Sequence, residues 1–129
     1  MNKILVEVSV GELLDKISIL EIKQEKINDP EKLKFINDEH GILKDQLENN
    51  VKSDEKLNNL FQSLKDINAK LWVIEDDKRL CEKNSDFTEN FIRLSRDVHF
   101  LNDDRAKIKL EINHLTGSKI KEIKEYTSY

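Results

Sequence analysis

Apolar residues recur at alternating spacings of three and four between Asp54 and Lys83, and this periodicity constrains the fold more than any other feature of the chain. The positions of this seam are Leu57, Leu60, Leu64, Ile67, Leu71, Ile74, Lys78 and Cys81. Because such spacing places side chains on one face of an α-helix, the pattern predicts a long, coiled-coil-like helix over about residues 54–83.

A second seam of the same spacing follows after Asn84 and Ser85. Its positions are Phe87, Phe91, Leu94, Val98, Leu101, Arg105, Ile108, Ile112 and Leu115. Gly117 suits the left-handed residue that commonly ends a helix, so the pattern predicts a helix over about residues 87–115. Folding the chain at Asn84 and Ser85 would pair the two seams as an antiparallel hairpin.

The N-terminal half predicts a second, shorter hairpin. One seam comprises Val10, Leu13, Ile17, Leu20, Gln24 and Ile27, and the other comprises Leu33, Ile36, His40, Leu43 and Leu47. Ser9 with Glu12 fits a capping box at the start of the first helix, and Asp29 with Pro30 fits the boundary between the two. We predict helices over about residues 10–28 and 31–49.

The whole chain, residues 1–129, has the length of a single domain. We therefore predict an all-α fold, an antiparallel four-helix bundle made of two helical hairpins. Ile4, Val6 and Val8 alternate, which predicts a short strand or an extended segment before the first helix. Four apolar residues lie off the seams and form either contacts between the hairpins or a dimer surface: Phe35, Ile42, Ile92 and Phe100.

The charge distribution argues against nucleic acid and membrane partners. The net charge is −4, and basic and acidic residues are interleaved along every segment. Glu7 interrupts the apolar run that begins at Ile4, so neither a signal peptide nor a membrane span is expected, and the predicted location is the cytoplasm. The single cysteine, Cys81, lies on a seam and is expected to fill the core.

Arg105 is the most informative polar residue, because a guanidinium on an apolar seam requires partners that offset its desolvation. The hairpin register places Asn68 and Asn102 about one turn away, with Glu21 of the first helix as a candidate counter-ion. Two interpretations stay open. The group is either a structural polar layer that fixes the register or an anion-binding pocket.

A second polar cluster lies on one side of the third helix. Trp72, Glu75 and Arg79 follow one another at spacings of three and four, with Asp76 beside them. Glu75 and Arg79 have the spacing of an exposed helical ion pair, which is one interpretation of the cluster. The other interpretation is a groove that the cluster shares with Asn68. Asn68 lies seven residues from Glu75, which is roughly 10 Å along the helix axis.

No metal or cofactor is predicted. Six acidic residues raise the idea of a magnesium site for phosphate hydrolysis: Glu12, Asp15, Glu75, Asp76, Asp103 and Asp104. However, a chain with 26 acidic residues produces such spacings freely. His40, His99 and His114 share no metal-ligand spacing, and His40 is expected to lie near Glu21.

Several segments together resemble a family of small bacterial and phage helical proteins of unknown function. They are Val8 to Lys23, Leu71 to Asp77, Asn102 to Ala106 and Leu115 to Ser118. The resemblance implies gene neighbours that include glycosyltransferases and other surface-polysaccharide enzymes. It also emphasises a set of polar positions: Glu12, Asp15, Lys16, Glu21, Lys23, Trp72, Glu75, Arg79, Asn102 and Arg105.

Two classes of function follow. The first is a non-catalytic accessory or adaptor protein, associated with glycan biosynthesis, that binds a protein partner or itself. The alternative is a small enzyme or binding module for an anionic metabolite such as a nucleotide sugar or sugar phosphate. In that alternative Lys16, Arg79 and Arg105 contact the anion, and Glu21 or Glu75 acts as acid or base. Whether the chain is an enzyme stays open.

Overall fold

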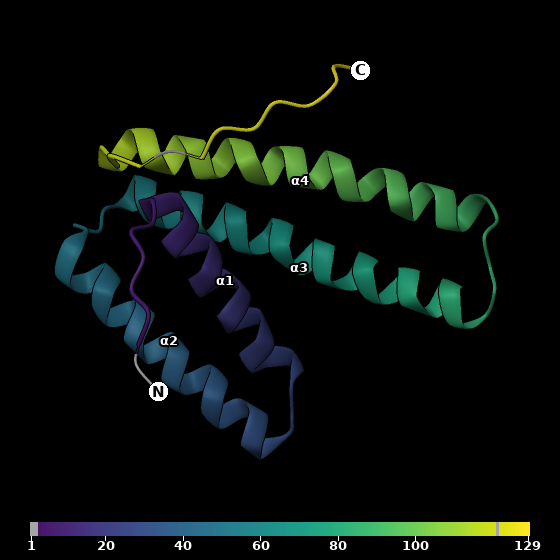
Figure 1. Ribbon diagram of the computed structural model, residues 1–129, viewed down its shortest axis with the longest axis horizontal. Coiled ribbons are helices and arrows are strands. Elements are labelled where there is room, and N and C mark those ends of the chain that lie inside the picture. The colour runs from purple at the N-terminus through teal and green to yellow at the C-terminus, as the bar shows by residue number, and fades with distance from the viewer. Residues whose placement is uncertain (1–2, 121) are drawn as a thin grey trace.

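The computed structural model describes residues 3–120 and 122–129, and this part of the chain contains four helices (Figure 1). They are α1 (Val10–Lys26), α2 (Pro30–Asn50), α3 (Glu55–Lys83) and α4 (Glu89–Thr116). Every boundary lies within two residues of its predicted position. The all-α class and the two hairpins are confirmed.

Local capping explains why the boundaries were predictable. The Ser9 hydroxyl accepts a hydrogen bond from the Glu12 amide at 3.0 Å, and the Asp54 carboxylate accepts one from the Leu57 amide at 2.7 Å. Gly117 ends α4 with a φ of 66°, in the left-handed region. Residues 3–8 are exposed and form no strand in the described part of the chain, so the strand alternative for this segment is wrong.

The two hairpins do not contribute equally to the bundle. α1 packs against each of the other three helices, whereas across the described residues α2 approaches α1 alone. Figure 1 shows the antiparallel α3–α4 hairpin extending past the α1–α2 hairpin, so that its half near the α3–α4 turn has no covering helix. α1 is therefore the central helix of the fold.

The hydrophobic core lies where α1 crosses the first half of α3 and the last half of α4. Leu14, Leu57, Leu64 and Ile112 form its buried cluster, and Leu64 and Ile112 are fully inaccessible to solvent. Burying a side chain of this size stabilises a fold by about 1.5–3 kcal/mol. This crossing therefore supplies most of the apolar stabilisation that holds the hairpins together.

The four apolar residues off the seams do not join the hairpins. The exposed fractions are 72% for Phe35, 58% for Ile42, 55% for Ile92 and 40% for Phe100. The interpretation of these residues as contacts between hairpins is therefore wrong. Phe35 and Ile42 lie on α2 and Ile92 and Phe100 on α4, and each helix uses its seam for packing, which leaves these side chains on the outside.

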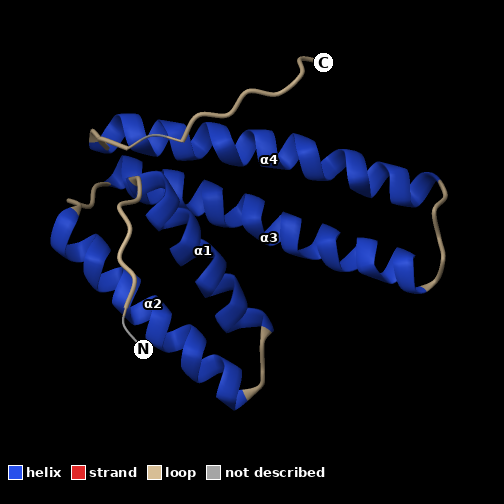
Figure 2. Cartoon of the chain, in the orientation of Figure 1, coloured by secondary structure: helices blue, strands red, loops and turns tan. Residues whose placement is uncertain are grey.

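The C-terminal segment returns along α4 (Figure 2). The Tyr129 hydroxyl donates a hydrogen bond to Asp103, and the Tyr129 ring lies 5.3 Å from the His99 ring. Within the described residues, no helix combines the length and apolar character that crossing a membrane requires.

Candidate functional site

The site begins with an unusually close approach of α1 to α4 at Gly11. A Cβ atom added to Gly11 would lie 2.5 Å from the main-chain oxygen of Lys109, so only glycine fits without moving a helix. The Gly11 amide also donates a 2.7 Å hydrogen bond to the side-chain oxygen of buried Asn113. This crossing carries the next turn of α1 into direct contact with α4.

Asp15 lies in that next turn and is 1% exposed. Its carboxylate accepts two hydrogen bonds from Arg105, at 2.9 Å from Nε and 2.6 Å from a terminal nitrogen. The Asn68 amide donates a third at 2.9 Å and a further bond of 2.8 Å to the Ser18 hydroxyl. Bidentate, charge-assisted pairing of this kind is what permits a carboxylate to be buried.

Lys109 forms a second ionic group one turn further along α4. Its ammonium lies 2.7 Å from Glu12, 2.7 Å from Glu122 and 3.9 Å from Asp15. Lys109 is 6% exposed, so these carboxylates offset the cost of burying it. The C-terminal segment therefore contributes directly to the packing of α1 on α4.

Burial and charge oppose each other at these groups. Burial raises the pKa of Asp15, but hydrogen bonds from Arg105 and Asn68 and the charges of Arg105 and Lys109 leave that pKa below its ordinary value. Burial lowers the pKa of Lys109, yet the hydrogen bonds that its ammonium donates to Glu12 and Glu122 leave the pKa raised. Asp15, Arg105 and Lys109 are therefore charged at neutral pH.

The polar layer predicted around Arg105 exists, but its counter-ion is Asp15. Glu21 instead lies 3.0 Å from His40 and 3.5 Å from Lys65, so its predicted pairing with Arg105 is wrong. Glu21 follows Asp15 by six residues, which is roughly 9 Å along the helix. The expected proximity of His40 to Glu21 is confirmed.

The remaining predicted residues divide between the layer and the surface. Asn102 accepts a 3.4 Å hydrogen bond from Arg105, so it belongs to the layer. Lys16 is exposed and contacts neither polar cluster. The sequence analysis missed Ser18, Lys109 and Asn113. For Ser18 the signal is the second face of α1, where small or polar residues have the spacing of a packed stripe: Gly11, Asp15 and Ser18. Lys109 and Asn113 lie on α4 and follow Arg105 at spacings of four, which is the signal for them.

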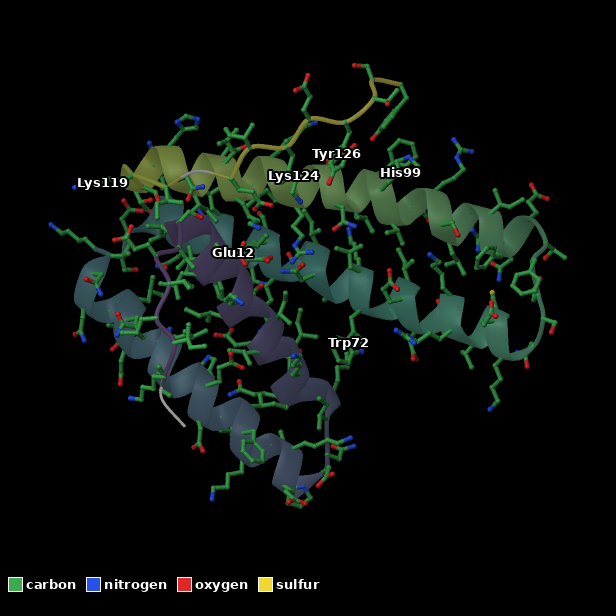
Figure 3. The ribbon with its side chains drawn as sticks, viewed as in Figure 1. Glu12, Trp72, His99, Lys119, Lys124 and Tyr126 are labelled. Carbon is green, nitrogen blue, oxygen red and sulfur yellow. The ribbon has the colours of Figure 1, made fainter. Side chains whose placement is uncertain are left out.

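A groove of about 320 Å³ opens beside this layer, between α1 and the α3–α4 hairpin. We call it the Trp72 groove, and its lining consists of Ile19, Ile22, Asn68, Leu71, Trp72, Glu75, Asp76, Arg79 and Arg105. Figure 3 shows Trp72 on the side of α3 that faces the end of α1. The two polar clusters therefore line one groove. The contacts of the described residues include no ion pair between Glu75 and Arg79.

The acidic residues considered for magnesium do not converge. Asp15 and Glu12 face Arg105 and Lys109, and Asp103 faces Tyr129. Among residues 3–120 and 122–129, no three histidine, cysteine or acidic side chains gather at metal-binding distance.

The fold and the paired polar layer define a class of small helical-bundle proteins whose first helix is held on a long hairpin by a buried ion pair. The chain belongs to the family of unknown function DUF6165, which it matches over residues 4–129. No curated protein and no solved structure matches it.

Proposed function

We propose that this protein is a non-catalytic helical accessory protein that associates with a second copy of itself through a groove of the α3–α4 hairpin that neither α1 nor α2 lines. The observation that carries the proposal is an apolar groove of about 630 Å³ on that hairpin. We call it the outer groove, and its lining consists of Ala69, Lys70, Val73, Ile74, Asp97, Phe100 and Leu101.

The outer groove has the composition of an interface. Val73 is 48% exposed and Phe100 is 40% exposed, although both belong to a continuous apolar surface. Contiguous apolar surface on a protein marks sites of association more often than isolated apolar residues do. A bare pair of antiparallel helices also lacks the additional helices that complete a bundle.

The charges of the outer groove favour a second copy as the occupant. Lys70 lies on α3 and Asp97 on α4, on the two sides of the apolar strip. A two-fold axis along the hairpin would place α3 of one copy over α4 of the other. Lys70 would then face the partner subunit's Asp97, and the symmetry would repeat that contact. The product is an antiparallel four-helix core made from two hairpins.

The state of the buried charges supports a non-catalytic role. Asp15, Arg105 and Lys109 are bonded to one another or to neighbouring carboxylates, and these bonds hold α1 on the hairpin. A general acid or base has to exchange its proton with a substrate, so it must be within hydrogen-bond reach of one. Asp15 is fully enclosed and is committed to Arg105.

Size-exclusion chromatography with light scattering, across a wide range of protein concentration, tests the proposal. We expect a dimer, and we expect Val73→Asp to be monomeric with unchanged helical circular dichroism. Lys70→Glu and Asp97→Lys should each weaken the dimer, and the double variant should restore it because the charges again face their opposites. Lys83→Glu, on α3 but outside the outer groove, is the control. A wild-type protein that is monomeric at every concentration would contradict the proposal.

The setting we propose is the cytoplasm, beside enzymes of surface-polysaccharide assembly. The support is the resemblance carried by segments such as Val8 to Lys23, together with the adaptor-like surface described above. Affinity purification of the tagged protein from its own host, followed by mass spectrometry, tests this setting. Enrichment of glycosyltransferases that is lost in the Val73→Asp variant is expected. A partner set without glycan enzymes would remove this part of the proposal.

A further inference from the structure

The Trp72 groove has no part in the association proposed above, because the outer groove is lined by α3 and α4 alone. We propose that the Trp72 groove is a binding site for a neutral, hydroxylated ring of monosaccharide size. The proposal does not depend on dimer formation, and it follows from the shape, the fixed polar groups and the charge of the groove.

The shape suits one ring. A volume of about 320 Å³ is at the small end of ligand-binding pockets, which span about 300–1,000 Å³. Ile19, Ile22 and Leu71 supply apolar walls, and Trp72 is only partly buried. An indole face of this kind packs well against the C–H face of a sugar ring.

Two polar groups of the groove are held in fixed orientations. The Asn68 amide nitrogen donates to both Asp15 and Ser18, so its oxygen must point the other way. In the described part of the chain no buried side-chain nitrogen or oxygen lacks a partner, and no protein group donates to this oxygen. The Asn68 oxygen therefore opens to the groove as an acceptor.

Arg105 supplies the matching donor. Two of its nitrogens are committed to Asp15, and the third makes only a long 3.4 Å contact with Asn102. Hydrogen atoms on that third nitrogen remain available in the groove. A hydroxyl group both donates and accepts, so a fixed donor beside a fixed acceptor suits hydroxyl groups better than a ligand of one polarity.

The charge of the groove argues against the anionic metabolite expected from the sequence. The lining carries two carboxylates, of Glu75 and Asp76, and two guanidinium groups, of Arg79 and Arg105, so its formal charges sum to zero. The chain as a whole carries −4. A phosphate or a cation would therefore meet as much repulsion as attraction from these four groups, whereas a neutral ligand needs no net charge in the groove.

The rim supports the same ligand. Glu75, Asp76 and Arg79 are exposed at the edge of the groove, where the carboxylates accept from hydroxyl groups and the guanidinium donates to them. A hydrogen bond to a charged group contributes about 1.5–3 kcal/mol, which corresponds to roughly a tenfold to hundredfold change in affinity.

The intrinsic fluorescence of the protein provides the test, because Trp72 is the single tryptophan. The wild-type protein is titrated with methyl glucoside, methyl galactoside and methyl N-acetylglucosaminide, and separately with glucose 1-phosphate and putrescine. We expect a saturable change in Trp72 emission with at least one neutral glycoside, and weaker binding of the phosphate and the diamine. No saturable change with any neutral glycoside, or tighter binding of glucose 1-phosphate or putrescine, would overturn the proposal.

Isosteric variants locate the site. Glu75→Gln and Asp76→Asn should each weaken binding of the responding glycoside about tenfold, because each replaces a charged acceptor by a neutral one. Asp77→Asn removes the same charge from the next position of α3, outside the groove, and should leave the affinity unchanged. Equal losses in all three variants would contradict the site. The monomeric Val73→Asp variant should bind as the wild type does, which separates this proposal from the one above.

Discussion

The two halves of the α3–α4 hairpin share one apolar periodicity but have different surroundings. In the half that α1 covers, Leu64 and Ile112 are fully buried. In the half near the turn, Cys81 and Leu94 of the seams are 5% and 7% exposed, but Phe87 of the seam is 54% exposed. The buried polar residues of the hairpin, by contrast, lie only in the covered half of its described residues: Asn68, Lys109 and Asn113. Apolar spacing thus identifies a helix, and polar residues on its packed side identify where another helix crosses it.

The largest expected effect comes from removing the charge that joins the covered half to α1. Arg105→Ala removes both hydrogen bonds that Arg105 donates to buried Asp15 and leaves Lys109, 3.9 Å away, as the remaining cation, which should cost about 3–5 kcal/mol of unfolding free energy. Arg93→Ala, on the exposed half of α4, should change it by less than about 0.5 kcal/mol. Urea unfolding followed by circular dichroism measures both. Similar losses of unfolding free energy in the two variants would contradict the difference between the covered and the exposed half.

Alanine substitutions at two glycines should change the stability in opposite directions. Gly11 lies where α1 crosses the covered half of the hairpin, and Gly41 lies on α2, away from that crossing. Gly11→Ala places a Cβ against the Lys109 backbone, and forcing the helices apart should cost about 1–3 kcal/mol. Gly41→Ala on α2 meets nothing within 4 Å, so it should stabilise the protein by about 0.5–1 kcal/mol through helix propensity. Thermal unfolding of the two variants is the measurement. If Gly11→Ala stabilised the protein, this would show that α1 and α4 can pack at a larger separation without loss of stability.

Acid should weaken the covered half in particular. The pKa of Asp15 is lower in the folded protein than its ordinary 3.8, so its contribution is present at neutral pH and is lost as the pH falls below that value. Asp15→Asn should be less stable at neutral pH and should lose this part of the acid dependence. Asp86→Asn, in the α3–α4 turn, should remove a smaller part of the acid dependence, because the pKa of Asp86 is lowered only by hydrogen bonds from Thr88 at the surface. Unfolding free energies between neutral pH and pH 2 provide the check.

The smallest effect is expected for an ion pair on the rim of the covered half. Lys65 lies 3.0 Å from Glu25, whose side chain is 60% exposed. Lys65→Met should therefore change the unfolding free energy by less than about 1 kcal/mol, and added salt should abolish the difference. A loss as large as that of Arg105→Ala would show that burial is not what distinguishes the two ion pairs.

Much of the fold was predictable because its signals are local. Ser9, Asp54 and Gly117 cap their helices through residues no more than four positions away, and the seams need only the helical repeat. The arrangement of the two hairpins was not predictable in the same way, since their relative placement depends on contacts far apart in the sequence. This is why the inner contact between the hairpins, one of the two interpretations of Phe35 and Ile92, is wrong.

The candidate site shows the same division. Arg105 and Asn68 stood out because they interrupt an apolar pattern, and Trp72, Glu75 and Arg79 because they share a helix face. Glu21 was the candidate counter-ion of Arg105 on α1, and nothing in the spacing alone distinguishes it from Asp15. The deciding residue is Gly11, which allows α1 to approach α4 one turn before Asp15.

The ion pair between Asp15 and Arg105 also affects how the chain folds while it is being synthesised. Its two members are 90 residues apart in the sequence. Ribosomes add about 5–20 residues per second, so Asp15 is synthesised roughly 5–20 s before its counter-ion. During that interval α1 can pack against α2, but the Arg105 guanidinium that pairs with Asp15 has not yet been made. A nascent chain that stalls before Arg105 would therefore present an unfinished helix surface to chaperones and proteases.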